Sequence, residues 1–259
     1  MRYFFHVGYR GSNYCGWQRQ PHHLTVQEVF ETTIGKVLKE DITILGCGRT
    51  DSGVHASQYF FHLDTKKMGD TDMAFVLNKI LPEDIAVFDV IPVAENAHAQ
   101  FDARVRTYDY FIHTYKDPFL SSVSSFYLLD KMDIHAMKKA VALLTRYNDY
   151  RAFCKSPDQY LHATCTISFA KLFSDTTGDK LRFQISSNRF LKGMIRAIVA
   201  RLLKVGTGEL SVDEFESYLI SKKTLPNLEF AYPQGLFLSK VSYPYLDLEP
   251  RREFLPEWS

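Results

Sequence analysis

Residues 25–38, "TVQEVFETTIGKVL", predict a helix that packs one of its faces against a sheet. Thr25 and Glu28 have the spacing of a capping box, which starts a helix by satisfying its first backbone N–H groups. The apolar positions recur at helical spacing. They are Val26, Val29, Phe30, Ile34, Val37 and Leu38.

Strand patterns surround this helix on both sides. Residues 3–10 alternate as a strand before it, and strands are expected near 42–47 and 57–63 after it. A second helix ends at Pro82, and "IAVFDVIPV" from Ile85 is interpreted as a buried strand. The apolar residues of this second helix are Met73, Val76, Leu77 and Ile80. The first part of the chain therefore has the order β-α-β-β-α-β.

The same order is expected again further along the chain. The predicted elements are a strand near 104–115, a helix with Ile134, Met137, Val141 and Leu144, strands near 164–173 and 180–187, a helix from Phe190 to about Val205, and a closing strand near 236–243. A capping box at Ser211 and Glu214 predicts one extra, inserted helix.

The repeated order predicts an α+β fold of two ferredoxin-like halves. We expect them to be joined through a shared mixed or antiparallel sheet, with flanking helices and a central cleft. The predicted domains are residues 1–97 and 98–259, divided where the small and polar segment near 94–103 lacks periodicity. Because many unrelated proteins use this topology, the fold alone does not give the function.

The composition excludes several classes of protein. The 259 residues are 46% hydrophobic, and the 31 basic and 30 acidic residues leave a net charge of +1, so any nucleic-acid site has to come from local clustering. No apolar run approaches the roughly 18 residues of a membrane span, and the first residues alternate like a strand, which favours the cytoplasm and no membrane partner. The cysteines show no disulfide pattern and are expected to be reduced thiols. They are Cys15, Cys47, Cys154 and Cys165.

The motifs of cofactor chemistry are missing from the sequence. It has no phosphate-binding loop and no dinucleotide fingerprint, so we expect no nucleotide cofactor. The nine histidines have no metal-ligand spacing, so no metal is expected either. A nucleophile elbow is also missing, although sequence alone does not exclude a Ser-His-Asp arrangement. A lone carboxylate, arginines and aromatic residues remain.

The carboxylate is Asp51, in "GCGRTDSGVHA" at residues 46–56. Asp, Ser and Gly in succession are what a tight connection between two strands uses, so turn formation accounts for this segment when it is considered by itself.

Several segments together resemble one family. They are "YRGSNYCGWQRQ" at 9–20, "VQE" at 26–28, "GRTDSGVHA" at 48–56, "LPEDIAV" at 81–87, "HAQFDARVRTYDYFI" at 98–112, "NRFLKGMIRAIV" at 188–199 and "GLFLSKVSYP" at 235–244. Their order and spacing resemble the tRNA pseudouridine synthase A family over nearly the whole chain.

The resemblance implies the pseudouridine synthase fold and an isomerase that converts uridine to pseudouridine in the anticodon stem-loop of tRNA, at tRNA positions 38–40. It also implies a homodimer, with RNA crossing both subunits, and no metal or soluble cofactor. Asp51 matches the catalytic aspartate of the family. A carboxylate can attack or stabilise the sugar, as in glycosidases, or remove a ribose proton, and the sequence leaves both roles open.

Three further residues match positions that the family uses to bind its substrate. Arg49 matches an arginine that displaces the target base, and its alternative interpretation, which we favour less, is a solvent-facing charge beside a turn. Tyr108 matches a tyrosine that packs on the target uracil, and its alternative role is to fill the core. Arg196 matches an arginine that pairs with the catalytic carboxylate, and otherwise it borders the apolar face of a helix.

A wider group of polar residues lies in or near the matched segments and is expected to line a basic groove for RNA. These residues are Arg10, Gln18, Arg19, Arg104, Arg106, Arg189 and Lys192. Gln100 stands where the family usually has arginine, and Lys192-Gly193 where an aromatic or histidine pair is common. The segment "SPDQYLHATCTI" at 156–167 lacks the usual arginines.

These departures leave alternatives for the target and for the activity. The protein could act on another tRNA site or another RNA, or it could be a catalytically idle RNA-binding homologue. A ribosyl hydrolase that uses the same carboxylate is a third possibility, and it would release free uracil.

Overall fold

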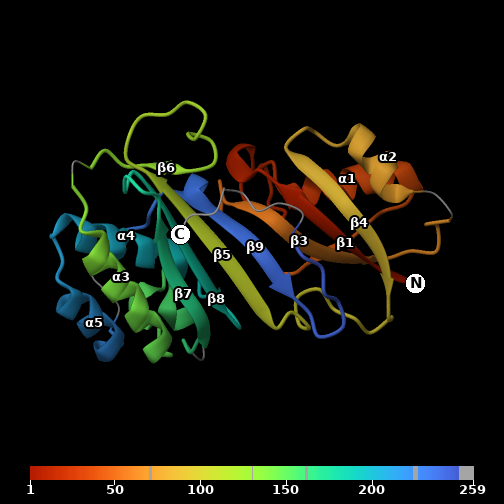
Figure 1. The fold of residues 1–259 in the computed structure, drawn as a ribbon. Helices are drawn as coiled ribbons and strands as arrows, with labels where there is room; N and C mark the ends of the chain where they lie inside the picture. Colours follow the sequence, from red (N-terminus) through yellow and green to blue (C-terminus); the bar gives the residue numbers. More distant parts are fainter. Residues whose placement is uncertain (70–71, 130, 161–162, 224–226, 251–259) are drawn as a thin grey trace. The chain divides into compact units, whose positions relative to one another are not determined.

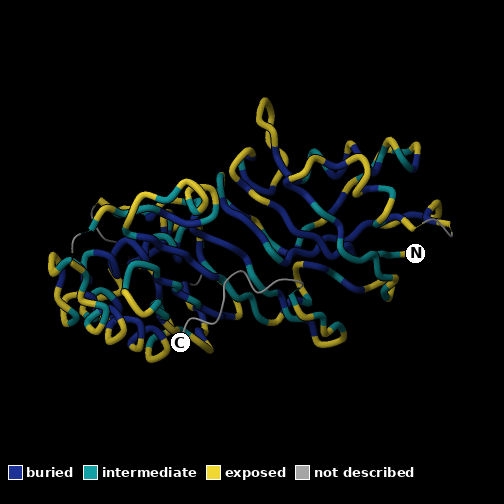
Figure 2. The backbone as a smooth tube through the Cα atoms, turned by 45° about the horizontal axis from the view of Figure 1, so that its top comes forward, coloured by how far each residue is buried: buried dark blue, intermediate teal, exposed yellow. Residues whose placement is uncertain are grey.

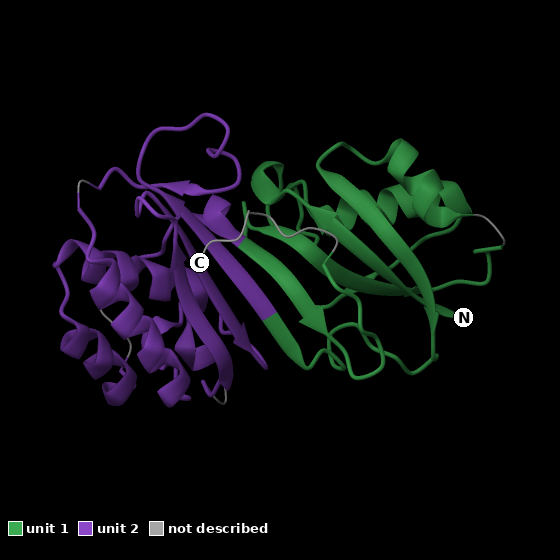
Figure 3. Cartoon of the chain, viewed as in Figure 1, with its two compact units in different colours: residues 1–106, 237–254 green, residues 107–236, 255–259 purple. Residues whose placement is uncertain are grey.

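Two units make up the chain (Figures 1 and 3). The computed structural model describes residues 1–69, 72–129, 131–160, 163–223 and 227–250. Within that part of the chain, unit 1 contains residues 1–106 and 237–250, and unit 2 contains residues 107–236. The chain thus returns to unit 1 near its C-terminus. The domain division at residues 97 and 98 remains a prediction.

Unit 1 has the predicted order β-α-β-β-α-β. Its elements are β1 (Arg2–Tyr9), α1 (Val26–Leu38), β2 (Leu45–Gly46), β3 (His55–Asp64), α2 (Met73–Ile80) and β4 (Ile85–Val93), followed much later by β9 (Leu236–Ser242). The strands lie in the order β4-β1-β3-β9, and β2 pairs with β3. β1 is antiparallel to both neighbours, whereas β9 is parallel to β3, so the pairing is mixed.

The core of unit 1 lies on both faces of this sheet, whose strands are largely buried in Figure 2. On one face Phe61 stacks on Phe5, with ring centroids 4.8 Å apart, and contacts Phe30 of α1 at the same distance. The other face carries Phe4 and Phe60, which contact Tyr243. One face is therefore covered by a helix and the other by a C-terminal segment of the chain.

Two of the predicted strands differ from the observed ones. The strand near 42–47 is reduced to Leu45–Gly46, because the backbone N–H and C=O of Ile44 bond to the side chains of Glu31 and Gln27 rather than to a strand. β4 is an edge strand and only partly buried, so the prediction of a buried strand was wrong. Its exposed Pro92 is typical of an edge, where a missing backbone donor is tolerated.

The described residues of unit 2 combine a second set of strands with three α-helices. The elements are β5 (Val105–His113), β6 (Ser125–Phe126), α3 (Ile134–Leu143), β7 (Ile167–Ser174), β8 (Lys180–Ser187), α4 (Met194–Thr207) and α5 (Val212–Ser221). β5 starts in unit 1, and the strand order is β5-β8-β7. α3 packs on β7, α4 and α5. In the described parts of both units, short 3₁₀ helices span Gly11–Asn13, Leu144–Arg146, Arg151–Phe153, Pro157–Gln159 and Pro233–Gly235.

The helix starts in unit 2 follow local chemistry. α5 begins with the predicted capping box between Ser211 and Glu214. α4 begins at Met194 rather than at Phe190, because Gly193 precedes it with a φ of 72°. The closing strand, β9, forms as predicted but pairs with β3 of unit 1. The α+β class, with mixed strand pairing and flanking helices, is confirmed.

Candidate active site

Asp51 lies on the loop between β2 and β3, in a tight turn. The N–H of Val54 donates to the carbonyl of Asp51 at 3.1 Å, and Gly53 has a φ of 76°. The turn chemistry expected from Asp-Ser-Gly is therefore present. Asp51 itself is partly accessible and Arg49 is exposed, so both side chains can meet a ligand.

The segment after β1 holds this loop from one side. The N–H of Trp17 donates to the carbonyl of Thr50 at 3.2 Å, and the N–H of Gly53 donates to the carbonyl of Tyr14 at the same distance. The hydroxyls of Tyr9 and Thr50 are 2.9 Å apart. The segment at residues 9–20 is thus bonded to the Asp51 loop through its backbone.

Glycines in this segment allow the close approach. A Cβ on Gly16 would lie 2.4 Å from the carbonyl oxygen of Thr50, and the φ of Gly16 is +83°. A Cβ on Gly11 would lie 1.9 Å from the carbonyl oxygen of Val54. Neither position has room for a side chain unless the loop moves.

A second set of contacts holds the start of the loop. The hydroxyl of Tyr59 donates to the carbonyl of Gly48 at 2.5 Å, and its ring lies 4.0 Å from that of Trp17. Burial raises the pKa of Tyr59 well above its usual value, so this phenol remains a donor. Arg106 donates to the carbonyl of Cys47 through Nη2 at 2.7 Å and Nε at 3.2 Å, and to the carbonyl of Gln100 at 2.9 Å. Arg106 was predicted to line an RNA groove, and here it supports the loop.

The other residues of unit 1 that were predicted to bind RNA differ in their exposure and in their contacts. Arg10 is 3.4 Å from the exposed Glu83, a weak surface pair. Gln18 and Arg104 are exposed. The guanidinium of Arg19 faces two carboxylates of α1, Glu31 at 3.1 Å and Glu28 at 3.6 Å. Much of its charge is therefore balanced within the protein.

In unit 2, Tyr108 and Arg196 each contact an aromatic ring. Tyr108, on β5, packs edge-to-face with Phe190 at 5.1 Å and is partly exposed. Arg196, on α4, donates through Nε to the carbonyl of Ala231 at 2.6 Å and lies 5.8 Å from the ring of Phe230. Both side chains are held in place from outside their own element. Sequence reasoning did not assign Phe190 or Phe230 to the site: it placed Phe190 at the start of a helix, and it did not single out Phe230.

The start of α4 also brings Arg189 and Lys192 together. Arg189 lies 5.6 Å from the ring of Tyr160, whose hydroxyl accepts the N–H of Lys192 at 3.1 Å. A Cβ on Gly193 would lie 2.6 Å from Phe230. Phe230 therefore occupies the space of a side chain at 193, which explains locally why the sequence departs to glycine here. Leu161 and His162, within the segment that lacks arginines, lie outside the described residues.

The predicted site residues thus fall into two groups. Unit 1 holds Asp51 and Arg49, and unit 2 holds Tyr108, Arg189, Lys192 and Arg196. The pairing of Arg196 with Asp51 joins residues of different units and remains a prediction.

The cysteines form no disulfide, and three of the four are buried. Burial raises the pKa of the thiols of Cys47 and Cys165 to about 11, and all four cysteines are unpaired, as expected. Within the described ranges, no group of three or more His, Cys, Asp or Glu residues has an arrangement that could hold a metal ion. None of the helices described is long and apolar enough to cross a membrane.

Unit 1 thus carries a partly accessible carboxylate on a backbone-fixed loop, and unit 2 carries arginines that lie near aromatic rings. Arginines and aromatic rings are side chains that proteins use to bind flipped or single-stranded nucleotides. Comparison with known proteins specifies the class. The profile of a family described as tRNA pseudouridine synthase matches residues 6–102 and 140–244. The chain is 39% identical to the tRNA pseudouridine synthase A of Parabacteroides distasonis, over 94% of this chain and 96% of the relative.

Further similar proteins have the same name. The tRNA pseudouridine synthase A of Azobacteroides pseudotrichonymphae is 37% identical, over 94% of this chain and 97% of the relative. That of Colwellia psychrerythraea is 35% identical, over 94% of each. The chain belongs to the tRNA pseudouridine synthase family. The matched ranges include Asp51 and Arg196, whereas Tyr108 lies in the unmatched stretch between them.

Proposed function

We propose that this protein isomerises uridine to pseudouridine in the anticodon stem-loop of tRNA, with Asp51 as its catalytic carboxylate. The observation that carries the proposal is the Asp51 loop. Its backbone is bonded on both sides, at Thr50 and at Gly48, while the Asp51 side chain stays partly accessible. Family membership supplies the reaction.

The reaction rearranges the bonds of one nucleotide. The N1–C1′ bond breaks, the uracil turns, and a C5–C1′ bond forms; C5 then loses its hydrogen to solvent and N1 gains a proton. The atoms balance without an oxidant or a hydrolytic water. A carboxylate serves this sequence either by adding to C1′ and leaving again, or by taking a ribose proton and returning it to the same carbon once the C5–C1′ bond has formed. Asp51 is proposed for one of these two roles.

Three side chains are proposed to assist Asp51, two of them by acting on the base. Arg49, exposed beside Asp51, takes the space that the flipped uridine leaves. Tyr108 packs on the uracil, and a ring face holds a base without fixing its edge, which suits a base that has to turn. Arg196 keeps the Asp51 carboxylate ionised and oriented. Arg10, Gln18, Arg104, Arg189 and Lys192 are proposed to contact the RNA backbone.

The assembly and location are part of the same proposal. We place the protein in the cytoplasm, where tRNA is modified, as a homodimer that binds tRNA across both subunits. The departures at Gln100 and Lys192-Gly193 leave a second candidate, in which the same chemistry acts on another tRNA site or another RNA. Two further candidates are an idle RNA-binding homologue and a ribosyl hydrolase.

One assay separates these candidates. The protein is incubated with tRNA transcripts that carry uridine labelled with tritium at C5, without added metal or nucleotide. Tritium release and pseudouridine mapped to the anticodon arm are the expected result. Free uracil would indicate a hydrolase. If tRNA gives no product, total cellular RNA is offered next, where pseudouridine would indicate a different target and no product would favour an idle binder.

A further inference from the structure

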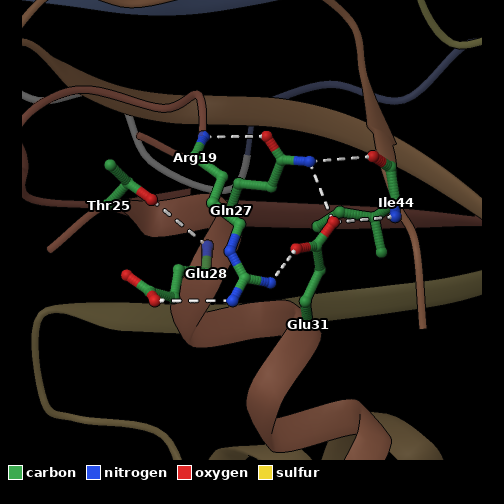
Figure 4. Close-up of polar contacts among 6 residues, drawn as sticks. All are labelled: Arg19, Thr25, Gln27, Glu28, Glu31 and Ile44. Atoms are coloured by element: carbon green, nitrogen blue, oxygen red, sulfur yellow. Dashed lines mark hydrogen bonds and ion pairs between the residues drawn. The ribbon is translucent and has the colours of Figure 1, made fainter. Parts of the chain in front are cut away.

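Glu31 of α1 is a buried carboxylate, 8% exposed, in contact with two other segments of unit 1 (Figure 4). Its Oε1 accepts the backbone N–H of Ile44 at 3.2 Å and the side-chain amide of Gln27 at 2.9 Å. Its Oε2 accepts from Nη1 of Arg19 at 3.1 Å. A buried carboxylate is costly unless it is bonded in this way.

Gln27, one turn earlier on α1, completes the contacts to the same two segments. Its Nε2 also donates to the carbonyl of Ile44 at 3.2 Å, and its Oε1 accepts the backbone N–H of Arg19 at 3.0 Å. Glu31 and Gln27 together satisfy both backbone groups of Ile44. We call Glu31, Gln27 and Arg19 the α1 clamp.

The two segments held by the clamp are those that support the Asp51 loop. Trp17, two residues before Arg19, donates its N–H to the carbonyl of Thr50. Ile44 leads through β2 into the loop itself. The start of α1 adds to this connection, because its N–H groups at Val26 and Gln27 donate to the carbonyls of Gly16 and Trp17 at 3.2 and 3.0 Å.

Glu28 provides a natural comparison on the same helix. Its carboxylate also lies near Arg19, at 3.6 Å, but its side chain is 35% exposed against 7% for Glu31. The hydrogen bond of its backbone N–H to Thr25 belongs to the helix cap. Glu28 therefore shares the charge and the helix of Glu31 without the contact to Ile44.

We propose that Glu31, through the α1 clamp, is a positioning residue for pseudouridine formation: it fixes the segment around Trp17 and the chain at Ile44, and thereby the position of Asp51. The inference rests on the proposed function. It also assigns Arg19 to this clamp rather than to an RNA phosphate.

The test compares Glu31→Ala, Glu31→Gln and Arg19→Ala with Glu28→Gln as the matched control. Rates are measured per folded protein, well below the thermal transition of each variant. Glu31→Ala should lower kcat about 10-fold to 100-fold with KM for tRNA changed less than about twofold, because misplaced catalytic groups slow the chemical step. Glu31→Gln keeps an acceptor for the N–H of Ile44, so its kcat should lie between those of Glu31→Ala and the wild type. Glu28→Gln should match the wild type.

Arg19→Ala separates the clamp from RNA binding. A lost phosphate contact reduces the salt dependence of tRNA affinity by about one unit of slope. The clamp predicts an unchanged slope and a lower kcat. An unchanged kcat in Glu31→Ala, or a reduced salt slope with unchanged kcat in Arg19→Ala, would overturn the inference. If Glu31→Ala does not fold, Glu31→Gln and Arg19→Ala still decide it.

Hydrogen exchange provides a readout that does not depend on activity. The backbone amides of residues 15–20 should exchange faster in Glu31→Gln than in Glu28→Gln, whereas equal exchange contradicts the clamp. If the wild-type protein forms no pseudouridine, the proposed function fails, and the exchange experiment still tests the clamp by itself.

Discussion

Asp51 combines two properties that sequence reasoning treats as alternatives. Its backbone belongs to a tight turn, with its carbonyl accepting the N–H of Val54. Its side chain is partly accessible beside the exposed Arg49. A turn residue held by its backbone leaves its side chain available for chemistry, so the turn interpretation and the catalytic interpretation are compatible.

Gly16 should be intolerant of any side chain. Gly16→Ala combines a positive φ with a Cβ 2.4 Å from the Thr50 carbonyl, so the Asp51 loop has to shift. We expect kcat to fall at least about tenfold, by the sensitivity of catalysis to placement. Gly208→Ala is the control, because its φ of +77° imposes similar strain with no atom within 4 Å. Equal activity of the two variants would show that the loop does not depend on this contact.

Arg196 contributes to stability whether or not it pairs with Asp51, because it bonds Ala231 and packs on Phe230. A loss of stability in Arg196→Ala therefore does not by itself test the pair. A double-mutant cycle with Asp51→Asn does. We expect the two effects on the free energy of unfolding to be non-additive by about 0.5–3 kcal/mol if the side chains interact. Additive effects on the free energy of unfolding would contradict the proposed pairing of Arg196 with Asp51.

At the scale of elements, the sequence predicts most helices and strands but misses contacts between distant segments. The pattern of α1 and its Thr25 cap were sufficient to predict that helix. β2 is short because Glu31 and Gln27 bond Ile44, and no periodicity carries that information. α4 starts late because Gly193 has a φ of 72°, and the ring of Phe230 leaves no space for a side chain there. The turn at Asp51 was predictable from its Asp-Ser-Gly run, whereas the contacts that Tyr59 and Glu31 make with the segments beside it were not.

β3 carries a histidine that should make stability depend on pH. His62 is buried, and burial, with the nearby Arg2, lowers its pKa from 6.5 to about 4. Its Nδ1 accepts the N–H of Ala99 at 3.2 Å, so the neutral ring is the one that fits. Between pH 6.5 and 4 the unfolded chain binds more protons than the folded protein, and the free energy of unfolding therefore falls as the pH falls.

His62 is expected to lower the free energy of unfolding by about 3 kcal/mol between pH 7 and pH 4. Denaturant titrations of the wild type and His62→Gln at several pH values measure it. The variant should show a smaller decrease over this range, since the other titrating groups remain. The same pH dependence in both proteins would assign the effect to residues other than His62.

At the scale of the whole molecule, a net charge of +1 does not indicate an RNA-binding protein. The proposed groove depends on local arginines and lysines, and two of the predicted arginines have partners within the protein. Arg106 donates to backbone carbonyls, and Arg19 lies near two carboxylates. Arg189 and Lys192, grouped around Tyr160, are exposed.

Affinity for tRNA should therefore fall as salt rises, because each phosphate contact releases counterions. Fluorescence or filter binding at several salt concentrations gives the slope. Arg189→Ala should reduce the slope by about one unit, while Arg19→Ala should leave it unchanged. An affinity that does not change with salt would rule out the basic groove.

The most direct test of the central claim is pseudouridine formation by Asp51→Asn under single-turnover conditions, with protein in excess over tRNA. The variant preserves the size of the side chain and removes its charge. We expect no pseudouridine above background, with tRNA affinity near that of the wild type and the folded structure retained. Substantial product from this variant would contradict the assignment of Asp51 as the catalytic carboxylate.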